Sequence, residues 1–203
     1  MVDFQSRNTR RGHDDDATGT DDKEGANETD ETDDGRETSE AETPETETGE
    51  TPDSTGVAVV AVGDAEDTAT EAVVGAIESG GNEIAIRERL RAEHDGVQQR
   101  VDALVDRRDT VAVVTVGGVG VGADDVTVEA VAPLFEKDLP GFGELFRLLA
   151  HDALGTGIVS VRATGGIADG TPVLCLPGDE SSARLGAEQI VAEELDALIE
   201  QAG

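Results

Sequence analysis

Residues Thr110–Glu129 read TVAVVTVGGVGVGADDVTVE, a pattern typical of a strand, a glycine-rich turn and the start of a helix. The β-branched apolar run from Val111 to Val116 is typical of a strand buried on both faces. Four glycines follow at once, and then Asp125 and Thr127 predict the start of a helix. Glycines bring backbone amides close to an anion, and a helix N-terminus adds partial positive charge. The stretch therefore indicates either an anion-binding loop or a tight crossover turn.

The same alternation of strands and helices continues on both sides. Upstream, strands at 57–62 and 83–86 precede helices that begin near Asp67 and Asp95. Downstream, the pattern predicts a helix capped by Thr127 that runs to Phe135, a break at 140–143, a helix from Glu144, strands at 157–162 and 172–176, and a last helix from Ser181. This order predicts a parallel sheet with right-handed crossovers.

Ligands of parallel sheets gather at the carboxyl ends of the strands. Asp64 follows the first strand of the domain, and the glycine loop that begins at Gly117 follows the third. We therefore expect Asp64 and the glycine loop to share one binding site.

The chain is strongly acidic. Its 203 residues include 46 Asp or Glu and 15 Lys or Arg, for a net charge of −31. Such a surface repels nucleic acid and anionic membranes, so neither is an expected partner. The charge suits a protein that stays soluble in very high salt, where repulsion is screened. An acidic interaction protein is the alternative interpretation of this charge.

Two regions differ sharply in composition. Residues 1–55 are rich in Glu, Asp, Thr and Gly and nearly lack large apolar side chains, which predicts a disordered acidic tail. Residues 56–203 carry the apolar periodicity of one α/β domain. The single cysteine, Cys175, lies in an apolar strand and indicates a small buried residue in a cytoplasmic protein. No apolar span approaches the length of a membrane helix, and no export signal begins the sequence.

Three motifs in order carry a family resemblance. They are GGVGVGADDVTVEAV (117–131), FEKDLPGFGELFR (135–147) and ADGTPVLCLPG (168–178). Together they resemble the MoaB/Mog family over residues 56–201. The resemblance implies a three-layer α/β/α fold with a mostly parallel sheet, a homotrimer or hexamer, and a role in molybdenum cofactor biosynthesis. Active members of the family bind molybdopterin and transfer AMP to it from Mg-ATP.

The resemblance also implies roles for particular residues. Asp125 falls on the aspartate needed for adenylyl transfer, where it would hold Mg²⁺ or help to place the substrate phosphate, and Glu136 matches a second acidic position of the catalytic site. The expected ligand-binding positions are Asp64, Gly117, Gly118, Gly120, Thr127, Glu144, Pro177 and Gly178. Without the resemblance, helix capping and a solvated surface would account for Asp125 and Glu144.

Several positions depart from the family pattern. Valines replace the usual threonines at 116 and 119 and a common serine at 161, and Val128 stands in place of a proline. Asp179 and Glu180 replace the residues that usually follow the Leu-Pro-Gly turn, which places two carboxylates near an anionic ligand. Three functions remain open: a molybdopterin adenylyltransferase, a diverged member that binds pterin or nucleotide or aids assembly without transferring AMP, and another reaction on the same fold, such as the nucleotide pyrophosphatase chemistry of CinA-type domains.

Overall fold

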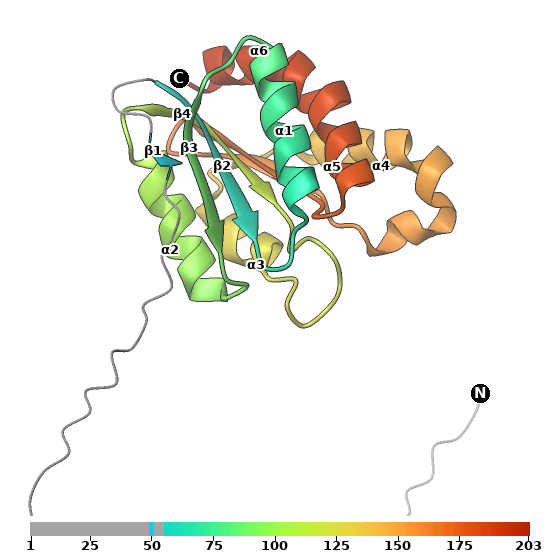
Figure 1. Ribbon diagram of the computed structural model, residues 1–203. Helices are drawn as coiled ribbons and strands as arrows, with labels where there is room; N and C mark the ends of the chain where they lie inside the picture. Colours follow the sequence, from blue (N-terminus) through green and yellow to red (C-terminus); the bar gives the residue numbers. More distant parts are fainter. Residues whose placement is uncertain (1–48, 51–54) are drawn as a thin grey trace, which may run out of the picture. The chain divides into compact units, whose positions relative to one another are not determined.

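The structure, a computed structural model, describes residues 49–50 and 55–203 (Figure 1). Strand β1 (Gly49–Glu50) pairs antiparallel with β3. The rest of the predicted acidic tail, apart from residue 55, lies outside the described residues. The domain continues as β2 (Gly56–Val62), α1 (Asp67–Ser79), β3 (Ile84–Leu90), α2 (His94–Val105), β4 (Thr110–Val116), α3 (Thr127–Val131), the 3-10 turn η1 (Ala132–Leu134), β5 (Lys137–Asp138), α4 (Pro140–Leu154), the 3-10 turn η2 (Gly155–Ser160), β6 (Thr164–Ala168), β7 (Thr171–Leu176), α5 (Glu180–Gly186), the π turn η3 (Ala187–Val191) and α6 (Ala192–Ala202).

The strands form one sheet in the order β1-β3-β2-β4-β7-β6-β5. Strands β3, β2, β4 and β7 run parallel, whereas β1, β6 and β5 pair antiparallel with their neighbours. The carboxyl ends of β2, β4 and β7 therefore meet along one edge of the sheet. The predicted parallel arrangement is confirmed for the centre of the sheet.

Helices cover both faces of the sheet. Val57 and Val59 of β2 join a core with α1, α4, α5 and α6, and their neighbours Ala58 and Val60 join a second core with α2 and α3. Figure 1 shows α1 and α2 on opposite sides of the strands. Both faces of β2 and, apart from Thr110 and Thr115, both faces of β4 carry apolar side chains, since each face packs on helices. The three-layer α/β/α prediction is confirmed.

The predicted strand at 157–162 is wrong. Residues Gly155–Ser160 form η2, and the strand is β6, which starts at Thr164. The run at 157–162 looked more strand-like because it contains β-branched residues, whereas β6 contains two glycines. Packing accounts for those glycines: a Cβ at Gly165 would lie 2.8 Å from the Leu174 side chain, and one at Gly166 would overlap the ring of Phe135.

Two helix boundaries also differ from the predictions. Helix α3 begins with Thr127 itself and ends at Val131, so Thr127 does not cap a helix that runs to Phe135. The α-helix cannot continue regularly because Pro133 lacks an amide for the Glu129 carbonyl. Helix α4 begins at Pro140, not at Glu144, because the fixed φ of proline suits a first helical position.

Strand β3 extends to Leu90, four residues beyond its predicted end. The extension carries charged side chains, which hid it in the sequence. Arg87 and Arg89 are exposed, while the Glu88 side chain is buried and accepts a 2.7 Å hydrogen bond from Arg100 of α2. The alternation typical of a strand is therefore present, and α2 neutralises its buried charge.

Candidate functional site

The carboxyl ends of β2, β4 and β7 pack directly against one another. Gly117 follows β4 with φ +100°, and a Cβ there would lie 2.6 Å from the Val62 carbonyl oxygen and 2.8 Å from the Ala65 Cβ. A Cβ at Gly178, after β7, would lie 3.1 Å from the Cα atoms of both Ala65 and Gly117. The glycines at 117 and 178 are therefore required for the three strand ends to meet.

The glycine loop, residues 117–126, is closed at its base by Thr127. The Thr127 side chain is buried, its hydroxyl donates to the Gly117 carbonyl at 2.8 Å, and its amide donates to the Gly118 carbonyl at 3.0 Å. Within the part of the chain that the structure describes, the amides of residues 118–121 have no hydrogen-bond acceptor. Unpaired amides on a turn at the end of a strand are the donors that an anion needs.

Asp125 lies on the far limb of this loop. One of its carboxylate oxygens, Oδ2, accepts a 2.7 Å hydrogen bond from the Gly122 amide, which fixes the side chain inside the loop. A Cβ at Gly120 would lie 2.5 Å from the same oxygen, so Gly120 leaves room for the carboxylate. The other oxygen, Oδ1, accepts no hydrogen bond from the described residues. Asp125 therefore offers one free carboxylate oxygen beside unpaired amides.

Arg162, which precedes β6, holds the outer part of the loop. Its guanidinium donates to the carbonyls of Gly120 and Asp125 and pairs with both carboxylate oxygens of Glu129 on α3. Its own amide donates to the Val119 carbonyl at 2.8 Å. The hydrogen bond from Arg162 also lowers the pKa of Glu129 below its usual range. Sequence reasoning assigned no role to Arg162. The available signal was that Arg162 is one of only 15 Lys or Arg residues in the chain.

A cavity of about 440 Å³ opens beside the loop. It is lined by residues from the loop, α2 and α3 together with Arg162. His94, the first residue of α2, has Nδ1 2.9 Å from an Asp95 carboxylate oxygen and Nε2 3.3 Å from the Glu129 carbonyl. Both partners are acceptors, so the imidazolium form satisfies both, and the Asp95 contact raises the pKa of His94. Sequence reasoning also missed His94.

The side chains of the two acidic residues after the Leu-Pro-Gly turn form hydrogen bonds with residues of α5. Asp179 caps α5, because its side chain accepts from the Ser182 amide at 3.0 Å. Glu180 pairs with Arg184 at 2.8 Å, and this hydrogen bond holds the pKa of the Glu180 carboxyl below its usual range. Arg184 thus offsets the charge of Glu180, while the Ser182 amide orients the Asp179 carboxylate without neutralising it, so the repulsion that the sequence suggested is weakened at Glu180.

The remaining predicted site residues differ in position. Pro177 is buried, and the Gly178 carbonyl accepts a 2.8 Å hydrogen bond from the Glu66 amide. Asp64 is exposed at the end of β2, on the same edge as the glycine loop. Glu144 is exposed near the start of α4, where the neighbouring Gly143 packs on the Ala163 carbonyl just before β6.

The structure does not bring Glu136 to the loop within one chain. Its amide donates to the Ile167 carbonyl on β6 at 2.8 Å, and Ile167 pairs with Pro172 near the start of β7. The turn at Gly178 lies at the opposite end of β7. Glu136 also directly precedes β5, and one strand, β6, lies between β5 and β7 in the sheet.

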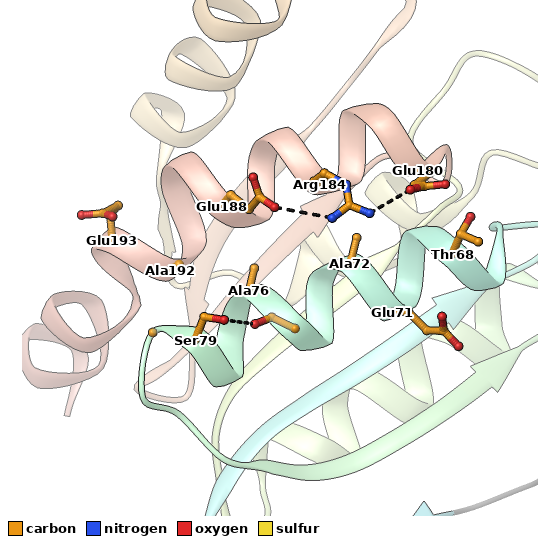
Figure 2. A pocket seen from close by; sticks show the side chains of 12 residues that line it. Thr68, Glu71, Ala72, Ala76, Ser79, Glu180, Arg184, Glu188, Ala192 and Glu193 are labelled. Atoms are coloured by element: carbon orange, nitrogen blue, oxygen red, sulfur yellow. Dashed lines mark hydrogen bonds and ion pairs between the residues drawn. The ribbon is translucent and has the colours of Figure 1, made fainter.

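A second and larger cavity, about 700 Å³, lies between α1 and the continuous α5–η3–α6 segment (Figure 2). Small α1 residues such as Ala72 and Ala76 face Arg184, which bridges Glu180 at 2.8 Å and Glu188 at 3.5 Å. None of the predicted site residues lines this groove. Its size alone therefore does not make it the candidate site.

The described residues contain no cluster of three or more His, Cys, Asp or Glu side chains arranged around a metal position. A magnesium ion does not require three protein ligands, because it is commonly bound by one carboxylate together with phosphate oxygens. The free Oδ1 of Asp125 fits that requirement. Over the same residues, no helix is both long and apolar enough to cross a membrane.

Comparison with known proteins gives a consistent family. The family described as a probable molybdopterin binding domain matches residues 54–197. Molybdenum cofactor biosynthesis protein B of Bacillus subtilis is 34% identical over 155 residues, covering 74% of this chain and 91% of that protein. The protein of the same name from Escherichia coli K12 is 30% identical over 135 residues, covering 66% of this chain and 79% of that protein.

Solved structures agree with these sequences. A crystal structure of a molybdenum cofactor biosynthesis protein B superposes with a TM-score of 0.69 and 27% identity, covering 75% of this chain and 98% of that one. The tungsten cofactor synthesizing protein MoaB from Pyrococcus furiosus gives a TM-score of 0.65 and 26% identity, covering 75% of this chain and 99% of that one. The chain therefore belongs to the molybdopterin-binding family that contains the MoaB proteins.

Proposed function

We propose that this chain is a molybdopterin adenylyltransferase of molybdenum cofactor biosynthesis. The observation that carries the proposal is the glycine loop, where the unpaired amides of residues 118–121 lie beside the free Oδ1 of Asp125. Amides of this kind bind phosphate oxygens, and both proposed substrates, molybdopterin and ATP, carry phosphate. The names of the relatives support the same pathway.

The reaction joins two phosphates. An oxygen of the terminal phosphate of molybdopterin forms a bond to the α-phosphorus of ATP, the bond from that phosphorus to the β-bridging oxygen breaks, and pyrophosphate leaves. Catalysis of such a transfer rests on positioning and charge stabilisation. The loop amides would bind phosphate oxygens, and Asp125 would hold magnesium, which supplies neutralisation of phosphate charge when bound.

The valines that depart from the family pattern do not obstruct this use of the loop. Val116 is fully buried in the core beneath α1, and Val119 is buried in the core beneath α2 and α3. Neither side chain takes a hydrogen bond from the loop amides. The loop therefore keeps its donors although two hydroxyls are missing.

The placement of Glu136 favours a second candidate function. Because Glu136 lies far along β6 from the glycine loop, one chain alone presents Asp125 without the second predicted acidic group. A protein that binds pterin or nucleotide without transferring AMP fits this arrangement. A site completed by a neighbouring copy fits it as well.

We further propose that the chain assembles as a homotrimer, or as a hexamer built from trimers, in the cytoplasm. Exposed apolar side chains on α4 and η2 support self-association: Leu145 is 38% exposed, Leu148 72% and Val159 84%. Single exposed apolar residues are ordinary, but three on consecutive elements suit a contact surface.

The proposed activity is tested by incubating the protein with molybdopterin, ATP and Mg²⁺ in multimolar KCl and measuring adenylated product and pyrophosphate. The expected result is equal amounts of both products, lost in Asp125→Asn. Asp124→Asn is the matched control, because Asp124 is the neighbouring exposed carboxylate and makes no side-chain hydrogen bond with the described residues. Binding of both substrates without product would support the second candidate and contradict transfer.

A further inference from the structure

Arg89 on β3 makes an unusual set of contacts for a surface residue. Its guanidinium donates to the Gly63 carbonyl at 3.0 Å, to the Ala65 carbonyl at 2.9 Å and to the Asp67 carboxylate at 2.7 Å. These acceptors span the whole connection between β2 and α1. One side chain from the neighbouring strand thus holds the loop at both of its ends.

The held loop lies at the centre of the candidate site. Ala65 is buried and packs on both Gly117 and Gly178. The next residue, Glu66, donates its amide to the Gly178 carbonyl at 2.8 Å and accepts from the Glu180 amide at 2.9 Å through its carboxylate. The 63–66 loop therefore packs against both the glycine loop and the turn at Pro177–Gly178, which are also joined directly by the 2.9 Å hydrogen bond from the Gly117 amide to the Leu176 carbonyl.

Arg89 also supplies positive charge to an acidic part of the surface. The loop and the facing turn carry the carboxylates of Asp64, Glu66, Asp67, Asp179 and Glu180. Arg184 pairs with Glu180 on the far side, while Arg89 contacts the loop itself. Without Arg89, two carbonyl dipoles and the Asp67 carboxylate lose their donor, and like charges at the loop repel one another. In multimolar salt the charge effect is screened, but the hydrogen bonds to the Gly63 and Ala65 carbonyls persist.

We propose that Arg89 is a positioning residue of the substrate site: by fixing the 63–66 loop, it keeps that loop packed on the glycine loop and on the Pro177–Gly178 turn in the arrangement that binds molybdopterin. This inference rests on the proposed function for the identity of the ligand. Arg89 does not touch the reacting atoms, so it acts on substrate affinity and leaves the transfer step unchanged.

The test compares Arg89→Gln with Arg87→Gln. Arg87 lies two residues away on the same strand and is similarly exposed (45% of its side chain against 41%). Among the described residues its guanidinium reaches only Glu71, at a 4.0 Å distance. Both changes remove one positive charge. We expect Arg89→Gln to raise KM for molybdopterin about tenfold, the effect of about one charge-assisted hydrogen bond, with kcat within about twofold. Arg87→Gln leaves both constants unchanged.

Conservative rescue separates positioning from general destabilisation. Arg89→Lys keeps a donor for the carbonyls but loses the planar fork, so we expect a KM increase of about threefold, between wild type and Arg89→Gln. If Arg89→Gln lowers the melting temperature while KM stays at the wild-type value, or if it lowers kcat alone, the inference is overturned.

Amide hydrogen exchange tests the positioning without substrate. In Arg89→Gln we expect the amides of Glu66 and Glu180 to exchange about tenfold faster than in Arg87→Gln, because local opening governs their exchange. If the wild-type protein binds no molybdopterin but this difference appears, the proposed function fails and the structural role of Arg89 stands. If molybdopterin binds and the exchange rates are equal, the role of Arg89 fails and the proposed function stands.

Discussion

The substitution Gly117→Ala tests the close meeting of the strand ends. Gly117 has φ +100°, outside the conformations that residues with a Cβ readily adopt. An added Cβ would also lie 2.6 Å from the Val62 carbonyl oxygen and 2.8 Å from the Ala65 Cβ. The first contact is with backbone, so no flexible side chain can move away to relieve it.

The expected loss of stability follows from these two effects. Holding a non-glycine residue in a sparsely populated backbone region costs about 1–3 kcal/mol. Overpacking by one methyl group costs about 1–3 kcal/mol more. The reduced entropy of the unfolded chain returns about 0.4–1 kcal/mol. We therefore expect Gly117→Ala to lower the free energy of unfolding by about 1–5 kcal/mol, against a total of about 5–15 kcal/mol for an ordinary domain.

Equilibrium unfolding in urea, at constant multimolar KCl, measures this loss. Gly75→Ala is the control: Gly75 lies in α1, has no heavy atom within 4 Å of an added Cβ, and is exposed. There alanine improves helix propensity, so we expect a gain of about 0.5–1 kcal/mol. A Gly117→Ala protein as stable as the wild type would show that the strand ends do not meet as described.

Three further changes test other parts of the account. Thr127→Val removes a buried hydroxyl that donates to the Gly117 carbonyl, and we expect a loss of about 1–3 kcal/mol in urea unfolding; an unchanged midpoint would contradict the closed loop base. The hydrogen bond with the Asp95 carboxylate raises the pKa of His94 in the folded protein above its unfolded-state value of 6.5. Protonated His94 therefore stabilises the fold fully below pH 6.5, and this stabilisation is lost as the pH rises through the higher folded-state pKa. His94→Gln should remove that pH dependence from the melting temperature, and an identical profile in the variant would refute it. Leu148→Glu should shift the protein to smaller species in sedimentation, whereas an unchanged mass would exclude α4 from the contact surface.

The central strands of the fold were predictable from the sequence alone. The runs of β2 and β4 are long and almost wholly apolar, with only Thr115 polar inside β4, because both faces of these strands are buried, and such runs indicate central parallel strands. Strand β6 was not predictable, because its glycines are required by side chains far away in the sequence: the Phe135 ring and the Leu174 side chain leave no room for a Cβ. The extension of β3 was hidden for a related reason: its buried Glu88 is acceptable only because Arg100 pairs with it.

The candidate site also contains residues that could be predicted from the sequence and residues that could not. Glycine positions and Asp125 were predictable because turn geometry depends on residues close together in the chain, and the family motif covers them. Arg162 was missed, because it contacts Gly120 across 42 residues, and the scarcity of basic residues did not show which segment it would hold. Thr127 was identified, but its predicted role as a helix cap was wrong: its hydroxyl donates to the Gly117 carbonyl and closes the loop.

Calorimetric titration of molybdopterin, and then Mg-ATP, into wild type, Gly120→Ala and Gly157→Ala in multimolar KCl tests whether the glycine loop binds the ligands. A Cβ at Gly120 would lie 2.5 Å from the Asp125 carboxylate, whereas one at Gly157 meets nothing within 4 Å. We expect the wild type and Gly157→Ala to bind both ligands equally, and Gly120→Ala to bind at least about tenfold more weakly. Equal binding by all three proteins, or no binding by the folded wild type, would contradict the glycine loop as the ligand site.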